Sequence, residues 1–166
     1  MRLAVRKANV LGALIVASGL SVAVLAAAGD KLTGGAEYID AGGVTFSMTA
    51  NAITTNKGLK GHIQYSREAQ TGALELYVHA PVKCLWVADD GMSAVIAGPA
   101  HVQSNPGDLE TGPWLIAAIS EGGIGAGDSV RVVFAEEWEA TNACLEGMTE
   151  FPGLVMEGNF TIRHGQ

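Results

Sequence analysis

The chain has 166 residues, a formal net charge of −7 and only 6% aromatic residues. Its length fits one ordinary domain that can bury a core. An acidic surface repels nucleic-acid phosphates and anionic lipid headgroups, which excludes a nucleic-acid-binding role.

Residues 1–28 have the pattern of a secretory signal peptide. Three basic residues within the first seven precede an apolar run over residues 8–25, and three alanines at 26–28 follow that run. A charged region, an apolar region and a small-residue exit form such a peptide, so we expect a secreted or periplasmic protein. The alternative is an uncleaved anchor, because about 18 apolar residues approach the shortest membrane-spanning helix.

Cleavage after Ala28 leaves 138 residues with 7 Lys and Arg against 17 Asp and Glu, a net charge of −10. A cleaved chain has no segment for stable membrane insertion. Residues 29–40 are polar and glycine-rich, and we expect them to form an exposed N-terminal segment. Residues 41–166 are then a single β domain.

After residue 29, short runs rich in Val, Ile, Leu, Thr and aromatic residues alternate with Gly, Pro, Asn and Asp. This pattern predicts an all-β fold, either an antiparallel barrel or a two-sheet sandwich of about eight strands. Hairpin connections are expected at 68–72, 89–91 and 121–128. The expected strands are 44–50, 59–66, 73–79, 82–88, 93–98, 114–121, 129–137 and 154–162.

Two longer stretches, 98–113 and 138–153, are expected to be irregular, the second with a single helical turn. The second contains Cys144, and the other cysteine is Cys84. An even pair in an exported chain favours a disulfide, which would close a loop worth roughly 4 kcal/mol in chain entropy. The alternative is two unlinked thiols.

Several short motifs occur in an order that resembles the post-COAP-type secreted bacterial proteins. They are a glycine-led strand at 42–50, Lys-Gly-His-Ile-Gln-Tyr at 60–65, an apolar strand at 84–87, Ala-x-x-x-Gly at 94–98 and Gly-Ala-Gly-Asp at 125–128. The resemblance implies a small exported β domain, found alone or appended to larger proteins, with no catalytic residues to transfer. The chain departs from that pattern at Glu121, where Asp is expected, and in the insertion that carries Cys144.

The candidate binding residues are His62, Tyr65, Glu121, Asp128 and Trp138. His62 and His79 lie on strands that we pair as a hairpin, so their rings are expected to approach each other. No metal ion and no cofactor are expected, because no histidines have i, i+4 spacing and no zinc or phosphate-loop motif occurs.

Glu121 and Asp128 stand at the two ends of a glycine-rich hairpin loop. Such a pair suggests a calcium site or a glycosidase pair. The alternative is that Asp128 accepts backbone N–H groups and fixes the turn. Trp138, with glutamates on both sides, either stacks on a sugar or a partner, or covers the core.

No Gly-x-Ser-x-Gly motif supports a nucleophilic enzyme. We therefore expect an exported non-enzymatic module that binds an unknown ligand or a cell-envelope partner. The alternatives are a secreted hydrolase that uses Glu121 and Asp128, and a structural envelope component.

Export is the first testable consequence. The secreted protein should begin near Gly29, because signal peptidase cleaves after a small-residue site. Intact-mass spectrometry of the protein from the medium or periplasm measures this, and a species that retains Met1 would contradict it.

Overall fold

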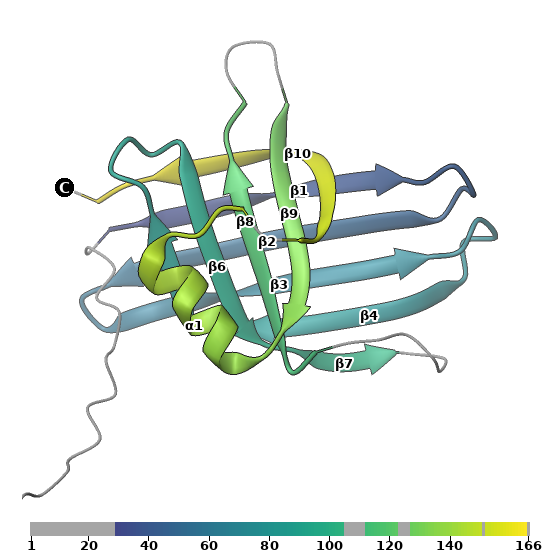
Figure 1. Ribbon diagram of the computed structural model, residues 1–166, viewed down its shortest axis with the longest axis horizontal. Helices are drawn as coiled ribbons and strands as arrows, with labels where there is room; N and C mark the ends of the chain where they lie inside the picture. The colour runs from purple at the N-terminus through teal and green to yellow at the C-terminus, as the bar shows by residue number, and fades with distance from the viewer. Residues whose placement is uncertain (1–28, 105–111, 123–126, 151, 166) are drawn as a thin grey trace, which may run out of the picture.

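A computed structural model describes residues 29–104, 112–122, 127–150 and 152–165, and Figure 1 shows their arrangement. The described residues form a ten-stranded antiparallel sheet with the strand order β5-β6-β8-β9-β10-β1-β2-β3-β4-β7. The prediction of an all-β fold is confirmed. The elements are β1 (Lys31–Ile39), β2 (Thr45–Thr55), β3 (Gly58–Glu68), β4 (Leu74–Pro81), β5 (Cys84–Val87), β6 (Ser93–Pro99), β7 (His101–Ser104), β8 (Trp114–Ser120), β9 (Asp128–Ala135), α1 (Glu137–Glu146) and β10 (Leu154–Arg163).

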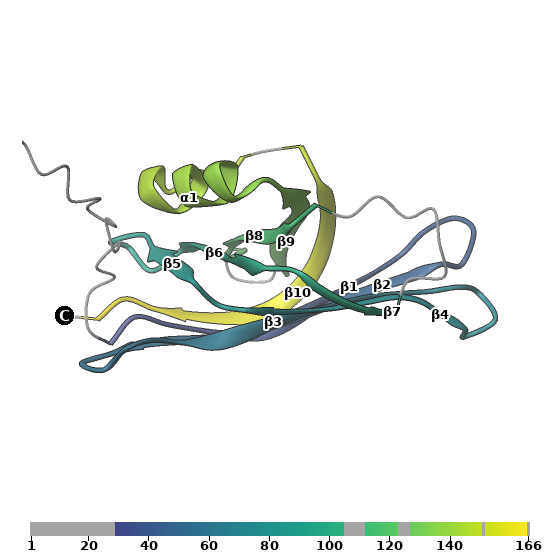
Figure 2. The ribbon, with the colours of Figure 1, turned by 90° about the horizontal axis from the view of Figure 1, so that it is seen from below.

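The sheet curls so that it covers its own apolar face. Figure 2 shows β1 to β4 and β10 in one layer, with β5, β6, β8 and β9 above them and α1 on the outside. β6 contacts β3 and β4, and β5 contacts β2. In β2 the inward residues Met48, Ala50 and Ala52 are buried and alternate with exposed ones, as expected for a strand with one dry face. The main core lies between the two layers.

β6 and β8 are buried on both faces, because one face meets the lower layer and the other meets α1. The helix begins with a capping box: the Glu136 side chain accepts from the Glu139 N–H, and the Glu139 carboxylate accepts from the Glu136 N–H at 2.9 Å. It ends at Gly147, whose φ of 61° is left-handed. The prediction of a single helical turn was wrong, since α1 has ten residues. Its buried face consists of the small side chains of Ala140, Ala143 and Cys144, so the segment lacks the large apolar residues that usually reveal an amphipathic helix.

β1 contradicts the expected exposed segment at 29–40. The strand pairs with β10 on one side and β2 on the other, with Leu32 and Ala36 in the core. Its glycines suggested a loop, but a side chain at Gly34 would collide with the backbone and ring of Phe160. Glycine in a strand can mark such a close approach, so the pair Gly34–Gly35 belongs to a tightly packed strand.

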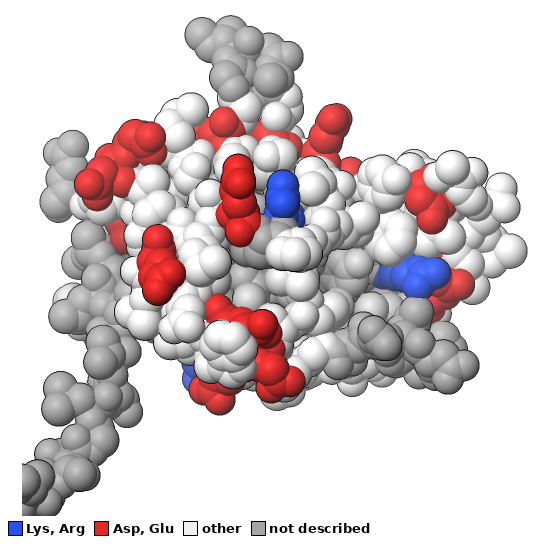
Figure 3. Space-filling model, in the orientation of Figure 1, with Lys and Arg blue, Asp and Glu red and all other residues white. Residues whose placement is uncertain are grey.

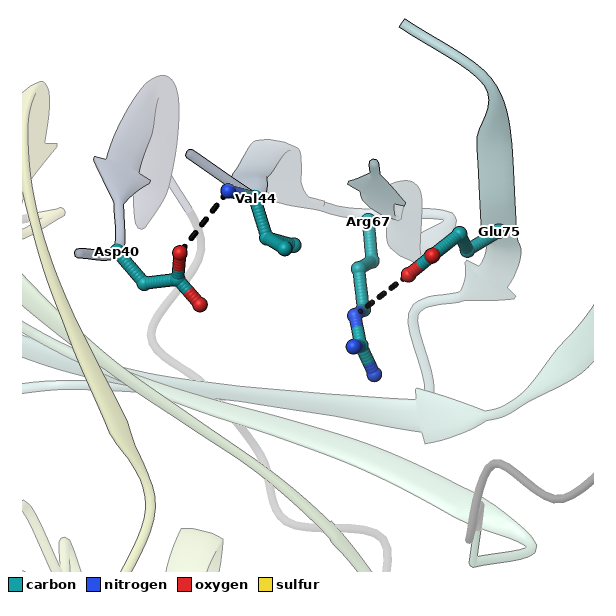
Figure 4. A network of polar contacts seen from close by, with 4 residues as sticks. All are labelled: Asp40, Val44, Arg67 and Glu75. Carbon is teal, nitrogen blue, oxygen red and sulfur yellow. Dashed lines mark hydrogen bonds and ion pairs between the residues drawn. The ribbon is translucent and has the colours of Figure 1, made fainter. Parts of the chain in front are cut away.

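The expected irregular stretch at 98–113 contains β7, which pairs with β4; residues 105–111 lie outside the described residues. Polar contacts hold the two hairpins that project at one end of the lower layer (Figure 4). The Asp40 carboxylate accepts the Val44 N–H at 2.9 Å in the β1–β2 turn, and Arg67 pairs with Glu75 across β3 and β4 at 2.9 Å.

Cys84 and Cys144 form the predicted disulfide, with a Cα–Cα distance of 6.2 Å and a sequence separation of 60. The bond joins β5 to α1. Both sulfurs lie in a second apolar cluster between α1 and the outer face of β6 and β8, which also contains Val95, Ala97 and Ile116.

Replacing both cysteines by alanine should lower the free energy of unfolding by about 4 kcal/mol, because the unfolded chain regains the entropy of an open 60-residue loop. Urea unfolding followed by circular dichroism measures the loss. Reduction of the native protein should produce a similar loss, and equal stability with and without reductant would contradict the prediction.

Candidate functional site

The sequence-predicted site residues are spread over the molecule and do not form one site. Tyr65 lies in the core, 7% exposed, with its ring edge-on to Phe134 at 5.8 Å. Burial raises the pKa of the Tyr65 phenol. This side chain packs the core and is not presented to a ligand at the surface.

His62 and His79 lie on β3 and β4, with their rings stacked and their centroids 5.8 Å apart. The predicted approach of the two rings is confirmed. The register places His62 opposite Pro81 and His79 opposite Gln64, so the two rings are diagonal neighbours across the ladder. Among the described residues, no group of three or more His, Cys, Asp or Glu side chains is arranged to hold a metal ion.

Glu121 and Asp128 both face β10. The ladder between β9 and β10 ends where Asp128 meets Gly158. Beyond that point, the Asp128 carboxylate accepts hydrogen bonds from the backbone N–H groups of Phe160 and Gly122. The Glu121 carboxylate accepts a hydrogen bond from the backbone N–H of Ile162 at 3.1 Å. The two side chains therefore replace the missing strand partner, which agrees with the turn interpretation of Asp128. Residues 123–126 of the loop lie outside the described residues.

A groove lies beside α1. Its volume is about 520 Å³, within the roughly 300–1,000 Å³ typical of ligand sites. Its lining is mainly apolar and comes from β8, β9, α1 and the connection to β10. We call it the α1 groove; its lining residues are Ile116, Val133, Phe134, Ala135, Trp138, Glu139, Asn142, Ala143, Glu146, Met148, Glu150 and Pro152.

Trp138 lies in the first turn of α1, lines this groove and is 64% exposed. Met148, which lines the same groove, is 41% exposed. Neither side chain is needed to fill the core, so both present apolar surface to solvent beside the hollow. An exposed tryptophan at a concave apolar site is typical of a binding surface.

Three carboxylates lie among the groove residues, those of Glu139, Glu146 and Glu150. Figure 3 views this side of the molecule and shows acidic side chains over and around α1, with few basic ones. The hydrogen bond within the capping box holds the Glu139 carboxylate at the first turn of the helix. The groove thus combines apolar walls with negative charge.

Sequence reasoning identified Trp138 but missed the rest of the groove, because the helix that forms one wall was expected to be irregular. The spacing of Ala140, Ala143 and Cys144 is the signal that could have found it. Residues three and four apart share one face of a helix, and Gly147 supplies the stop.

Comparison with protein families, with curated proteins and with solved structures gave no match. The resemblance to post-COAP-type proteins therefore stays a prediction. In the described part of the chain, no helix combines the length and apolarity that crossing a bilayer requires.

Replacing Asp128 by alanine should lower the free energy of unfolding by about 2 kcal/mol, because it strands backbone N–H groups of Phe160 and Gly122. The exposed Asp89 is the matched control, whose change to alanine should cost under about 0.5 kcal/mol.

Chelator should leave the unfolding midpoint of the unmutated protein unchanged if the carboxylate serves the backbone. A midpoint that rises with calcium and falls with chelator would instead make the loop a cation site.

Proposed function

We propose that this protein is an exported, non-enzymatic binding module whose α1 groove receives an apolar group of its ligand. The observation that carries this proposal is the groove itself: a hollow of about 520 Å³ with mainly apolar walls and an exposed tryptophan at one end. Concave apolar sites with a few polar groups are the usual form of ligand sites.

The carboxylates weigh against the hydrolase alternative. A general acid or nucleophile must reach its substrate, whereas Glu121 and Asp128 accept N–H groups of β10 and its neighbouring turn. A carboxylate that satisfies otherwise unpaired donors is costly to withdraw for catalysis.

The disulfide supports export, because such bonds persist mainly in oxidising compartments outside the cytoplasm. The acidic surface supports a soluble role after export, since a net charge far from zero opposes self-association. A purely structural envelope component has no need of a formed groove, so ligand binding distinguishes the two roles.

The neutral solvatochromic dye Nile red tests the groove. Its fluorescence should rise on mixing with the protein, and Trp138→Ala should weaken binding by about tenfold, because a large apolar wall is removed. Ile39→Ala is the matched control, since Ile39 is 58% exposed on β1 and outside the groove. Binding that both variants leave unchanged, or no binding at all, would contradict the proposal.

A further inference from the structure

We propose that the partner of the α1 groove is a polypeptide segment that carries an apolar anchor between two Lys or Arg residues and lies along α1. This inference rests on the proposed binding function. It adds the chemical class of the partner, which the positions of the charges around the groove indicate.

One line of side chains on α1 faces the groove. Trp138, Asn142 and Glu146 follow at intervals of four residues, so they lie above one another on the same helix face. The line begins with an apolar ring, continues with an amide and ends with a carboxylate. An amide both donates and accepts, which suits it to the backbone of a bound peptide.

Glu139 and Glu146 place two negative charges seven residues apart on the helix. With a rise of 1.5 Å per residue, this separation is about 10 Å along the axis. In a peptide with the polyproline II conformation, which has about three residues per turn and a rise of about 3.1 Å per residue, the side chains at i and i+3 point to the same side and are about 9 Å apart. A segment in this conformation with cations at i and i+3 can therefore reach both carboxylates, and the two residues between them are available to contact the apolar walls of the groove.

The third groove carboxylate, that of Glu150, lies outside α1 and is not part of this pair of helix charges. Glu150 also lines a second, smaller hollow of about 160 Å³, and the lining of that hollow includes the basic side chain of Arg131 on β9. The chain is acidic overall, which attracts a cationic segment from a distance and raises its association rate. A ligand with a single ammonium group would meet only one of the two helix charges, whereas a polypeptide supplies both cations at the required spacing.

A set of three labelled heptapeptides tests this inference by fluorescence anisotropy. The first contains Lys-Leu-Leu-Lys at its centre, the second has Gln in place of both lysines, and the third has Glu there. The lysine peptide should bind about tenfold more tightly than the glutamine peptide at low salt, and the glutamate peptide should bind most weakly. The difference should shrink as salt screens the charges.

The double variant Glu139→Gln with Glu146→Gln should reduce the preference for lysine to about twofold. Glutamine also serves in a capping box, so the helix start is retained. The matched control is Glu37→Gln with Glu157→Gln, which removes the same charge from an exposed pair on β1 and β10. This control should keep the preference.

The possible outcomes separate the inference from the proposed function. If Nile red binds and Trp138→Ala weakens it, but the three peptides bind alike or both double variants behave alike, the peptide inference is wrong and the groove remains a site for an apolar ligand. If neither dye nor peptide binds, the proposed function fails and the inference fails with it.

Discussion

The fold depends on β10, which pairs with β9 in the upper layer and with β1 in the lower one. A sheet that curls in this way buries its apolar face, but the strand at the bend loses one partner where the layers separate. Unpaired backbone donors are costly when water is excluded. The carboxylates of Glu121 and Asp128 accept the N–H groups of Ile162 and Phe160 at this place. Two residues that suggested chemistry thus satisfy the backbone at the bend.

A second constraint positions the candidate site. The disulfide ties α1 to β5, and small side chains on the helix let it lie close to β6 and β8. Because the helix covers only part of the outer face, Ile116 and Val133 line a hollow beside it. The groove therefore follows from the covalent tie and the close packing of the helix. A ligand would bind to a surface that the folded state already holds in place, which reduces the entropy lost on binding.

Charge around the groove is a local property and does not follow from the net charge alone. Glu139 serves the helix as part of its capping box and serves the groove as a fixed negative charge. One residue can fill both roles because the first helical turn also forms the end of the groove near Trp138. The same negative charge favours the N-terminal end of the helix dipole. The Glu139 carboxylate can therefore stabilise the start of α1 and also attract a cationic group to the groove.

The amino-acid sequence predicted the all-β class, most strands, the hairpins at 68–72 and 89–91 and the cysteine pair. Strand alternation, turn residues and an oxidising destination are local or compositional signals, so they can be read without the fold. That 31–39 is a central strand and 137–146 a helix became clear only from the packing of the folded chain. In both segments glycine or alanine replaces large apolar residues, since Phe160 or the outer sheet face lies too close for a larger side chain. Close packing removes the hydrophobic periodicity on which sequence reasoning depends, so the α1 groove emerged only when these segments were placed in space.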